Sequence, residues 1–500
     1  MRNAFLLIIV AVCFSSLFSC QKELNDSGGS GTDTTGNGTP SQSDLLKDSV
    51  YLYTKEVYFW HEVIPSYDVF NPRGYTGATD EEAATNEMDA IRAYQPLDRY
   101  SFVTTNAESE GLQTGTSNDF GFLVKAASLD RAEPVDSVYW FVNYVYDKSP
   151  AGIAGVERGW YVSKINNTPI AYDNASIDIL NNTFFGTATS ATFEFTKPDG
   201  TTTTSTLNYA NYTANSVLYE NVLSDNAQTH KIGYLVFNQF FGQTSRNELA
   251  NAFNDFAAAG INDLIVDLRY NRGGSTATQD TLANLIAPAS ANGKKMYTYI
   301  YNDSLQAGKY PLLYRKDPYN QYPTDIFTQA NNVVNFEKAG AITGLTRVFF
   351  IVSGSSASAS ELLINNLRPY MDVKLVGDTT YGKPVGFFPI DIFNYSIYPI
   401  SFKTVNSQNV GDYYSGFVPD KLVADGVNKS WGDVTEPCLG TALYYISNGT
   451  FGRKGGPNFS DESNRRALAR QKPYDVAYKQ LTARKFSGSF VEKGKMARRN

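Results

Sequence analysis

Three short segments carry residues that could do chemistry together. The first is Ser353-Gly-Ser-Ser-Ala-Ser-Ala-Ser-Glu361, which follows an apolar run and opens a helical pattern, so that Ser358 would stand at a helix N-terminus. Unbonded backbone amides at such an end can hold an oxyanion. Ser358 is therefore a candidate nucleophile, although Ser358-x-x-Glu361 also fits a capping box with no catalytic role.

The second segment, Gly377-Asp-Thr-Thr-Tyr-Gly-Lys-Pro-Val-Gly386, places Lys383 after the next apolar run. A lysine acts as a general base only when it is neutral. Lowering its pKa from about 10.4 to near 7 requires burial that disfavours the ammonium by roughly 4 to 5 kcal/mol. An apolar wall for such burial could come from Tyr381, Pro384, Val385 and Phe387. Taken alone, however, a Gly-Lys-Pro turn is more typical of a structural loop.

The third segment is Val266-Asp-Leu-Arg-Tyr-Asn-Arg-Gly-Gly-Ser275, in which Gly273 and Gly274 would let backbone amides approach a substrate oxygen closely. Its alternative interpretation is a tight loop. The chain has only two histidines, His61 and His230, and neither is expected at a strand end. A Ser-His-Asp triad is therefore disfavoured, and no His/Cys cluster suggests a metal site.

Strand and helix signals alternate around these segments. Strands are predicted near 232–237, 261–268, 347–353 and 373–377, with an amphipathic helix over 245–260. Such alternation predicts an α/β sheet whose functional groups gather at the carboxyl ends of the strands. Because the three segments follow three of these strands, we expect their polar residues to meet at one edge of the sheet.

Taken together, the three segments resemble the motif blocks of the C-terminal processing (tail-specific) proteases in order and spacing. The family's nucleophile is the middle Ser of Ser-Ala-Ser-Ala-Ser and its base is a Lys further on, here Ser358 and Lys383. The resemblance covers about 118–446. It implies an α+β multidomain chain in which a PDZ domain precedes an α/β catalytic domain with the crotonase-like fold of ClpP and enoyl hydratases. It also implies serine endopeptidase activity without a cofactor or a metal.

By this resemblance, Ser358 attacks the scissile carbonyl and Lys383 takes up its proton. The backbone amides of Ala359 and of Gly273 or Gly274 would then bind the oxyanion.

One position departs from the family pattern. Many members place a Gln four residues after the Lys, where this chain has Phe387. Since a phenyl ring cannot hydrogen-bond an amine, either Glu361 or Thr380 orients Lys383, or packing alone holds it, or the activity is weak.

Two smaller regions precede the predicted catalytic domain. Helical spacing predicts helices over 44–60 and 80–93, and short alternating runs from about 118 to 207 predict a β-rich domain. Within the latter, Ser149–Pro169 resembles the PDZ signature. That resemblance implies that a peptide C-terminus binds the loop and edge strand formed by Phe120, Gly121, Phe122 and Leu123. An ordinary β-hairpin core is the alternative.

The N-terminus has the pattern of an export signal. Arg2 precedes a short apolar run, and Leu17-Phe-Ser-Cys20 resembles the lipobox of bacterial lipoproteins, which implies a lipidated Cys20. Gln21-Lys-Glu23 resembles a surface-export tag, and we expect an anchor in the outer membrane of the cell envelope, with the membrane face left open. The Gly/Ser/Thr-rich stretch over 25–43 predicts a flexible tether.

Composition limits the remaining possibilities. A net charge of −7 and 42% hydrophobic residues indicate a globular chain and argue against nucleic-acid binding. Residues 451–500 carry 13 Lys/Arg against four acids, which predicts a solvated helical appendage. Of the three cysteines only Cys438 falls in the folded region, so no disulfide framework is possible there and this thiol is predicted to be structural.

These observations predict six segments: a signal peptide over 1–19, a linker over 20–43, a helical domain over 44–110, a PDZ-like domain over 111–215, the catalytic domain over 216–450 and a basic extension over 451–500. The predicted partners are polypeptide substrates, captured by their C-termini, and a membrane reached through the lipid anchor. Two alternatives stay open. One is a weak or inactive relative that binds peptides or hydrophobic ligands, and the other is a hydrolase of esters or glycans.

Overall fold

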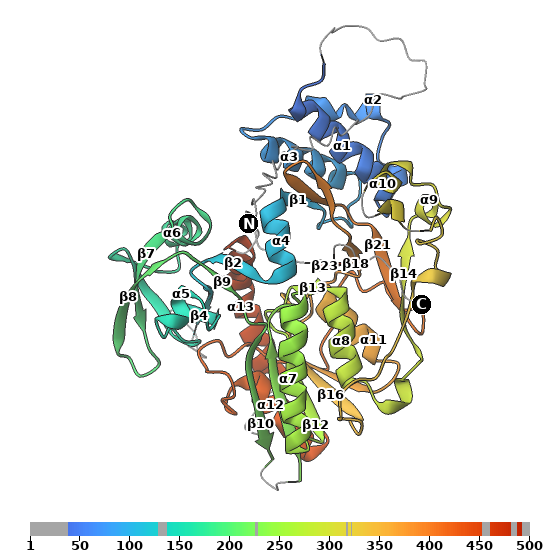
Figure 1. Cartoon of the computed structure of the whole chain (residues 1–500). Helices are drawn as coiled ribbons and strands as arrows, with labels where there is room; N and C mark the ends of the chain where they lie inside the picture. The colour runs from blue at the N-terminus through green and yellow to red at the C-terminus, as the bar shows by residue number, and fades with distance from the viewer. Residues whose placement is uncertain are drawn as a thin grey trace, which may run out of the picture. The chain divides into compact units, whose positions relative to one another are not determined.

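A mostly parallel six-stranded sheet positions the predicted chemistry (Figure 1). The computed structural model describes residues 39–128, 138–225, 229–316, 319–321, 323–452, 461–481 and 488–492. The sheet order is β10-β11-β12-β16-β17-β22, in which only β10 is antiparallel to its neighbour. The strands are β10 Val217–Ser224, β11 Lys231–Phe237, β12 Asp263–Asp267, β16 Arg347–Val352, β17 Asp372–Gly377 and β22 Lys421–Leu422. The four predicted strands are therefore confirmed as neighbours.

Helices cover both faces of this sheet, which explains why its central strands read as continuous apolar runs. On one face, Leu235, Val266 and Phe350 belong to a core shared with three helices, α7 Gln243–Ala259, α8 Thr276–Ile286 and α11 Ala359–Leu367. On the other face, Tyr234 and Phe349 pack with helix α12 Pro437–Asn448. The alternation of faces along each strand thus accounts for two separate apolar layers.

A second, smaller sheet adjoins the carboxyl ends of these strands. Its order is β13-β23-β18-β21-β14-β15. The strands are β13 Gly273–Ser275, β14 Lys295–Tyr301, β15 Val333–Asn335, β18 Val385–Phe387, β21 Phe402–Asn406 and β23 Gly488–Phe490. β23 comes from the C-terminal extension and lies between β13 and β18, parallel to both (Figure 1).

The N-terminal helical region contributes a strand to a small sheet whose other strands come from residues 390–398. The two predicted helices are present as α1 Gln42–Val57 and α3 Asp80–Ala93. After them, β1 Phe102–Thr105 forms a three-stranded sheet with β20 Tyr395–Tyr398 and β19 Ile390–Ile392. The chain from Gln42 onward is one compact unit. Shorter helices are α2 Tyr67–Phe70, α4 Asn106–Thr114, α9 Asp303–Gln306 and α10 Pro311–Tyr314.

The β-rich region forms its own sheet, with β3 at one edge. The order is β3-β4-β5-β7-β8, and β6 pairs with β5. The elements are β3 Phe122–Ser128, β4 Val138–Val145, α5 Pro150–Ile153, β5 Tyr161–Ile165, β6 Thr168–Pro169, α6 Asn174–Phe185, β7 Ser190–Thr196 and β8 Thr202–Asn208. A separate pair joins β2 Thr116–Asp119 to β9 Ala210–Thr213.

The C-terminal extension is not the solvated appendage that its charge predicted. Helix α13 Asp461–Leu481 packs against β3 and α6, and it buries Tyr474 and Tyr478. β23 is buried within the second sheet. The prediction failed because net charge describes the exposed side chains and does not report the few apolar residues that make the contacts.

Export and anchoring are not tested by the fold, because residues 1–38, Cys20 included, lie outside the described part of the chain. Within that described part, no helix combines the length and the apolar character needed to cross a bilayer.

A buried cluster of charges joins the β-rich region to the catalytic sheet. Arg269, just after β12, contacts Asp425 Oδ1 and Glu436 Oε1 at 2.9 Å each. From the β-rich region, Arg158 and Lys125 approach Asp425 to 3.2 and 3.6 Å. Burial alone would raise the pKa of Asp425, but the three cations hold it far below its ordinary value.

This cluster makes Asp425 important for stability. In Asp425→Asn the buried cations lose a shared anion, so we expect the free energy of unfolding to fall by about 3–5 kcal/mol at pH 7. Because the folded pKa is depressed, the contribution is complete above the unfolded value near 3.9 and is lost as the pH falls below it. Urea unfolding between pH 3 and 7 measures both. Glu194→Gln, at the half-exposed Lys164 pair, is the control and should change the midpoint little.

Candidate active site

The candidate nucleophile lies in the turn between β16 and α11. Ser358 has φ 58° and ψ −104°, and only 1% of the residue is exposed. A non-glycine residue at positive φ costs on the order of 1–3 kcal/mol, which the surroundings must offset, and such residues cluster at active sites. The Ser358 Oγ shares a hydrogen bond of 2.6 Å with the Ser489 Oγ of β23.

The candidate base lies in the turn that follows β17. The Lys383 side chain is buried, with its Nζ 3.9 Å from the ring centre of Phe387 and 4.6 Å from that of Tyr100. Burial lowers the pKa of the Lys383 ammonium well below its ordinary value, and the Arg272 and Arg92 charges add to the effect, whereas Asp98 and Glu361 oppose it. The side chain is therefore biased towards the neutral amine that a base requires.

A single carboxylate connects these two turns. Glu361, fully buried in the first turn of α11, accepts the backbone N–H of Ser358 at 2.9 Å, of Gly382 at 2.7 Å and of Lys383 at 2.8 Å. It also accepts the Thr380 hydroxyl at 2.6 Å. Burial raises the pKa of Glu361, while these four donors favour the anion and oppose the rise. Glu361 thus fixes the backbone of the nucleophile relative to that of the base.

Thr380 and Glu361 were predicted as alternative partners for the Lys383 amine. The Thr380 Oγ1 donates to Glu361 and accepts the Phe417 N–H at 2.7 Å. Glu361 therefore binds the backbone of both turns, while Thr380 binds Glu361 and the backbone of Phe417. The ring of Phe387, in the place of the usual Gln, instead covers the amine from 3.9 Å.

The glycines of the third segment lie beside the helix that begins after the nucleophile. Gly273 and Gly274 have φ of 102° and 137°, which only glycine adopts readily. A methyl group on Gly273 would lie 3.1 Å from the Ala359 nitrogen, so the two backbones are adjacent. The Gly273 N–H donates to the Asn271 Oδ1 at 2.9 Å, which favours Gly274 over Gly273 as the second oxyanion donor beside Ala359.

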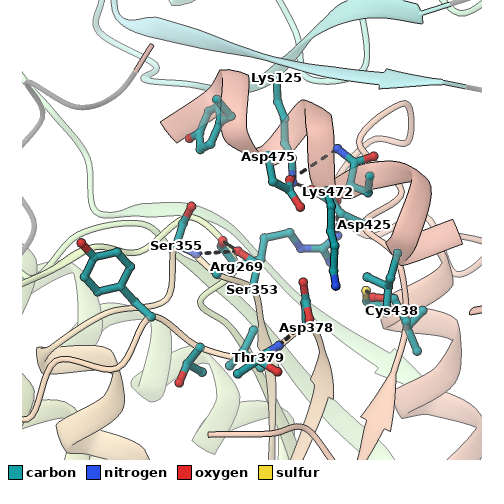
Figure 2. A pocket seen from close by; sticks show the side chains of 18 of the residues that line it. Lys125, Arg269, Ser353, Ser355, Asp378, Thr379, Asp425, Cys438, Lys472 and Asp475 are labelled. Carbon is teal, nitrogen blue, oxygen red and sulfur yellow. Dashed lines mark hydrogen bonds and ion pairs between the residues drawn. The ribbon is translucent and has the colours of Figure 1, made fainter. Parts of the chain in front are cut away.

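The immediate surroundings of the base are closed. Lys383 and Ser489 line a cavity of only about 10 Å³. Beside it, a pocket of about 540 Å³ reaches Thr380 and Tyr381. Figure 2 shows this pocket between Lys472 and Asp475 of α13 and the strand ends that carry Ser353 and Asp378. A polypeptide cannot reach the two catalytic candidates in this arrangement.

The predicted peptide-binding residues lie together at the start of β3. Phe120, Gly121, Phe122 and Leu123 are all buried. Gly121 has φ 82°, and its N–H donates to the Asp119 Oδ1 at 2.8 Å. The Phe120 ring packs edge-on against that of Phe193. Capture of a peptide carboxylate at this loop stays a prediction, with Asp119 as an opposing charge close by.

The histidines lie outside the site, as predicted. His230 Nδ1 is 2.5 Å from the Asp263 Oδ2 at the start of β12. The His61 Nε2 lies 2.6 Å from the Asp303 Oδ1. Together with Glu62 they form a partly exposed group of side chains of the metal-ligating kind, whose ligand atoms lie within 4.8 Å of one another. Sequence spacing could not reveal this group, because Asp303 lies far from His61 along the chain. Cys438 is buried in α12, and burial raises the pKa of its thiol, in agreement with a structural role.

Two residues of the site were missed by sequence reasoning. The Tyr100 hydroxyl donates to the Gly382 carbonyl at 2.8 Å while its ring covers Lys383. Ser489 contacts the nucleophile. Only one signal pointed to Ser489, namely that Gly488-Ser-Phe-Val491 is a short apolar run in an otherwise basic segment. Nothing local pointed to Tyr100.

Comparisons with known proteins give a family match and structural neighbours. Residues 231–421 match the family described as Peptidase family S41, which confirms the resemblance seen in the three motifs. A proposed S41 protease from Bacteroides fragilis NCTC 9343 has 21% identity and a TM-score of 0.57, over 80% of this chain and 97% of that one. The photosystem II D1 C-terminal processing protease has 15% identity and a TM-score of 0.44, over 77% and 94%. No curated protein matches.

The Glu361 contacts can be tested directly. In Glu361→Gln one oxygen becomes an amide that faces N–H donors, so we expect the two turns to separate. The reaction of Ser358 with a fluorophosphonate probe should slow at least tenfold, about 1.4 kcal/mol in activation free energy. Glu110→Gln, at an exposed position on α4, is the matched control. Equal labelling rates in the two variants would show that the carboxylate is not needed.

The burial of Lys383 has a consequence for stability that does not depend on activity. Because its pKa is lowered in the folded state, the unfolded state binds more protons between that lowered value and about 10.4, and the free energy of unfolding rises with pH there. Lys383→Met should remove this slope and be more stable than the wild type at pH 7, with a smaller difference at pH 9.5. Urea unfolding measures both, and the exposed Lys309→Met is the control. A less stable Lys383→Met at pH 7 would contradict the assignment.

Proposed function

We propose that this chain, which carries a peptidase family S41 domain, is an exported serine endopeptidase that cuts protein substrates with Ser358 as nucleophile and Lys383 as general base. The observation that carries the proposal is the Glu361 carboxylate, which accepts backbone N–H groups from both residues. A capping role alone would involve Ser358 but would not require the second turn.

Acylation follows from the placement of these groups. The Ser358 Oγ attacks the scissile carbonyl carbon while the neutral Lys383 amine accepts its proton, and the oxyanion is stabilised by the N–H groups of Ala359 and Gly274. The Lys383 ammonium then donates a proton to the leaving amine. A water molecule, activated by the same amine, hydrolyses the acyl-enzyme. Each step moves one proton through one nitrogen, so no cofactor takes part.

The surroundings of Lys383 support this role. An ordinary lysine would be charged at neutral pH and could not take up a proton. Here the rings of Tyr100 and Phe387 replace water around the amine, and burial lowers its pKa. Phe387 therefore helps to keep the amine neutral through desolvation, where a Gln would contribute a hydrogen bond.

Substrate capture by the β-rich region is the second part of the proposal. β3 is an edge strand, so its backbone can pair with an added peptide strand, and α6 packs next to it with the Phe184 ring centre 5.1 Å from that of Phe122. A lipid on Cys20 would hold the enzyme in the outer membrane, with the tether over 25–43 giving it reach.

One alternative is a binding protein of the same fold with weak or no activity. It is favoured by Phe387, whose ring lies beside the Lys383 amine where many family members have a Gln, and by the small size of the cavity that Lys383 lines, about 10 Å³. Under this alternative the S41 domain would hold a peptide or a hydrophobic ligand without cutting it.

The two functions are separated by one experiment. We expect the wild type to release peptides from casein and to be labelled by a fluorophosphonate probe. Ser358→Ala, Lys383→Ala and Lys383→Arg should each lose at least a hundredfold, because the first lacks the nucleophile and the others lack a neutral amine. Ser355→Ala, in the same serine-rich turn, is the matched control and should keep its activity.

Casein release by the wild type that persists in Ser358→Ala would contradict the assigned nucleophile. The absence of both labelling and hydrolysis in the wild type would favour the binding protein.

A further inference from the structure

The C-terminal extension lies in the one slot that a substrate strand would need. β13 carries the oxyanion glycines and β18 follows the base, and β23 fills the space between them. In register, Gly273 pairs with Gly488 and Gly386 with Ser489. Strand addition of this kind is a common way for proteins to bind extended peptides.

The contacts of β23 at the catalytic groups are those expected of a bound polypeptide. The Ser489 Oγ is 2.6 Å from that of Ser358. A methyl group on Gly273 would lie 2.5 Å from the Gly488 carbonyl oxygen and 3.1 Å from the Ala359 nitrogen, so this carbonyl lies on the same side of Gly273 as the oxyanion donor. Ser489 also lines the small cavity beside Lys383.

Anchors on both sides keep the segment in place. The Gly488 N–H donates to the Arg272 carbonyl and the Val491 N–H donates to the Phe387 carbonyl, each at 3.0 Å. Phe490 is fully buried. Beyond it, the Glu492 carboxylate accepts the Ser275 hydroxyl at 2.5 Å and forms an ion pair with Arg246 of α7.

The helix of the same extension covers the other predicted substrate contact. The Gln471 side chain of α13 donates to the Ala126 carbonyl on β3 at 3.0 Å, and Asp475 pairs with Lys125 of β3 at 3.2 Å. Figure 2 shows α13 over the pocket at the strand ends, with Asp475 near Lys125. One extension thus blocks both the edge of β3 and the slot beside Ser358.

We infer that residues 488–492 occupy in cis the position of the substrate polypeptide, and that substrates bind as an extended strand between β13 and β18 only when this segment leaves. The expected competition with substrates rests on the proposed function. The occupancy of the slot by residues 488–492 does not. Because the segment is tethered, its effective concentration is far above that of a free peptide, so weak contacts suffice to keep the slot filled.

The ion pair between Glu492 and Arg246 gives a test that leaves the catalytic groups intact. Arg246→Glu repels Glu492, and Glu492→Lys independently repels Arg246, so each should release the segment. The double variant Arg246→Glu/Glu492→Lys restores an opposite-charge pair and should close the slot again. We expect kcat/KM on casein-derived peptides to rise at least tenfold in each single variant and to return to the wild-type value in the double variant.

Binding in the inactive Ser358→Ala background makes the test independent of catalysis. The probe is a fluorescein-labelled, amidated Gly-Ser-Phe-Val-Gln peptide, and binding is followed by fluorescence anisotropy. Its neutral last side chain is repelled neither by Arg246 nor by the carboxylate that Arg246→Glu introduces. We expect at least tenfold tighter binding with Arg246→Glu or Glu492→Lys than without, and rescue in the double variant. Tighter binding without any turnover in the active background would uphold the occupancy while the protease function fails.

Two further outcomes test whether residues 488–492 occupy the substrate position. A cut between residues 488 and 492 in the wild type but not in Ser358→Ala, seen in the intact mass, would support the occupancy by showing that the segment is a substrate. Equal peptide binding and equal turnover in all variants would overturn it while leaving the protease function standing.

Discussion

The site depends on one buried carboxylate. Adjacent parallel strands bring the turns after β16 and β17 to the same edge of the sheet, but strand pairing does not set the distance between the turns. Glu361 does so, because its four donors come from both of them. A charge without water is tolerated only when each oxygen is hydrogen-bonded, so any displacement of either turn leaves an unpaired partner. The free-energy cost of that displacement keeps the backbones of Ser358 and Lys383 in fixed relative positions.

The second requirement, a neutral base, is met by a distant part of the chain. Tyr100 covers Lys383 from the N-terminal region, and Asp98 holds it there by accepting the N–H groups of Tyr100 and Ser101 at 2.9 Å each. The charge of Asp98 also favours the Lys383 ammonium. Asp98 therefore positions the ring of Tyr100 but opposes the lowering of the Lys383 pKa. The N-terminal helical region therefore contributes to the candidate active site, and its strand β1 pairs with β20 in a sheet with β19.

Sequence reasoning predicted the features that depend on local residue patterns. The four central strands, the strand ends that carry Ser358 and Lys383, and the apolar contact of Phe387 all follow from runs of residues and the geometry of parallel sheets. Tyr100 and Ser489 could not be reached, since their positions depend on tertiary contacts between distant segments. The choice between Gly273 and Gly274 depended on the hydrogen bond that the Gly273 N–H donates to the Asn271 Oδ1, which residue spacing alone does not reveal.

The two glycines also explain why the chain's own tail fits the slot. Only glycine readily adopts the positive φ of Gly273 and Gly274, and Gly273 leaves no side chain in the space beside β13 that the Gly488 carbonyl occupies. A strand edge of this kind bonds any extended backbone, so it discriminates poorly between substrate and tail. Discrimination must then come from the neighbouring contacts, such as the apolar cluster around Phe387. An enzyme that binds extended polypeptides by their backbone therefore has to control access of its own C-terminus.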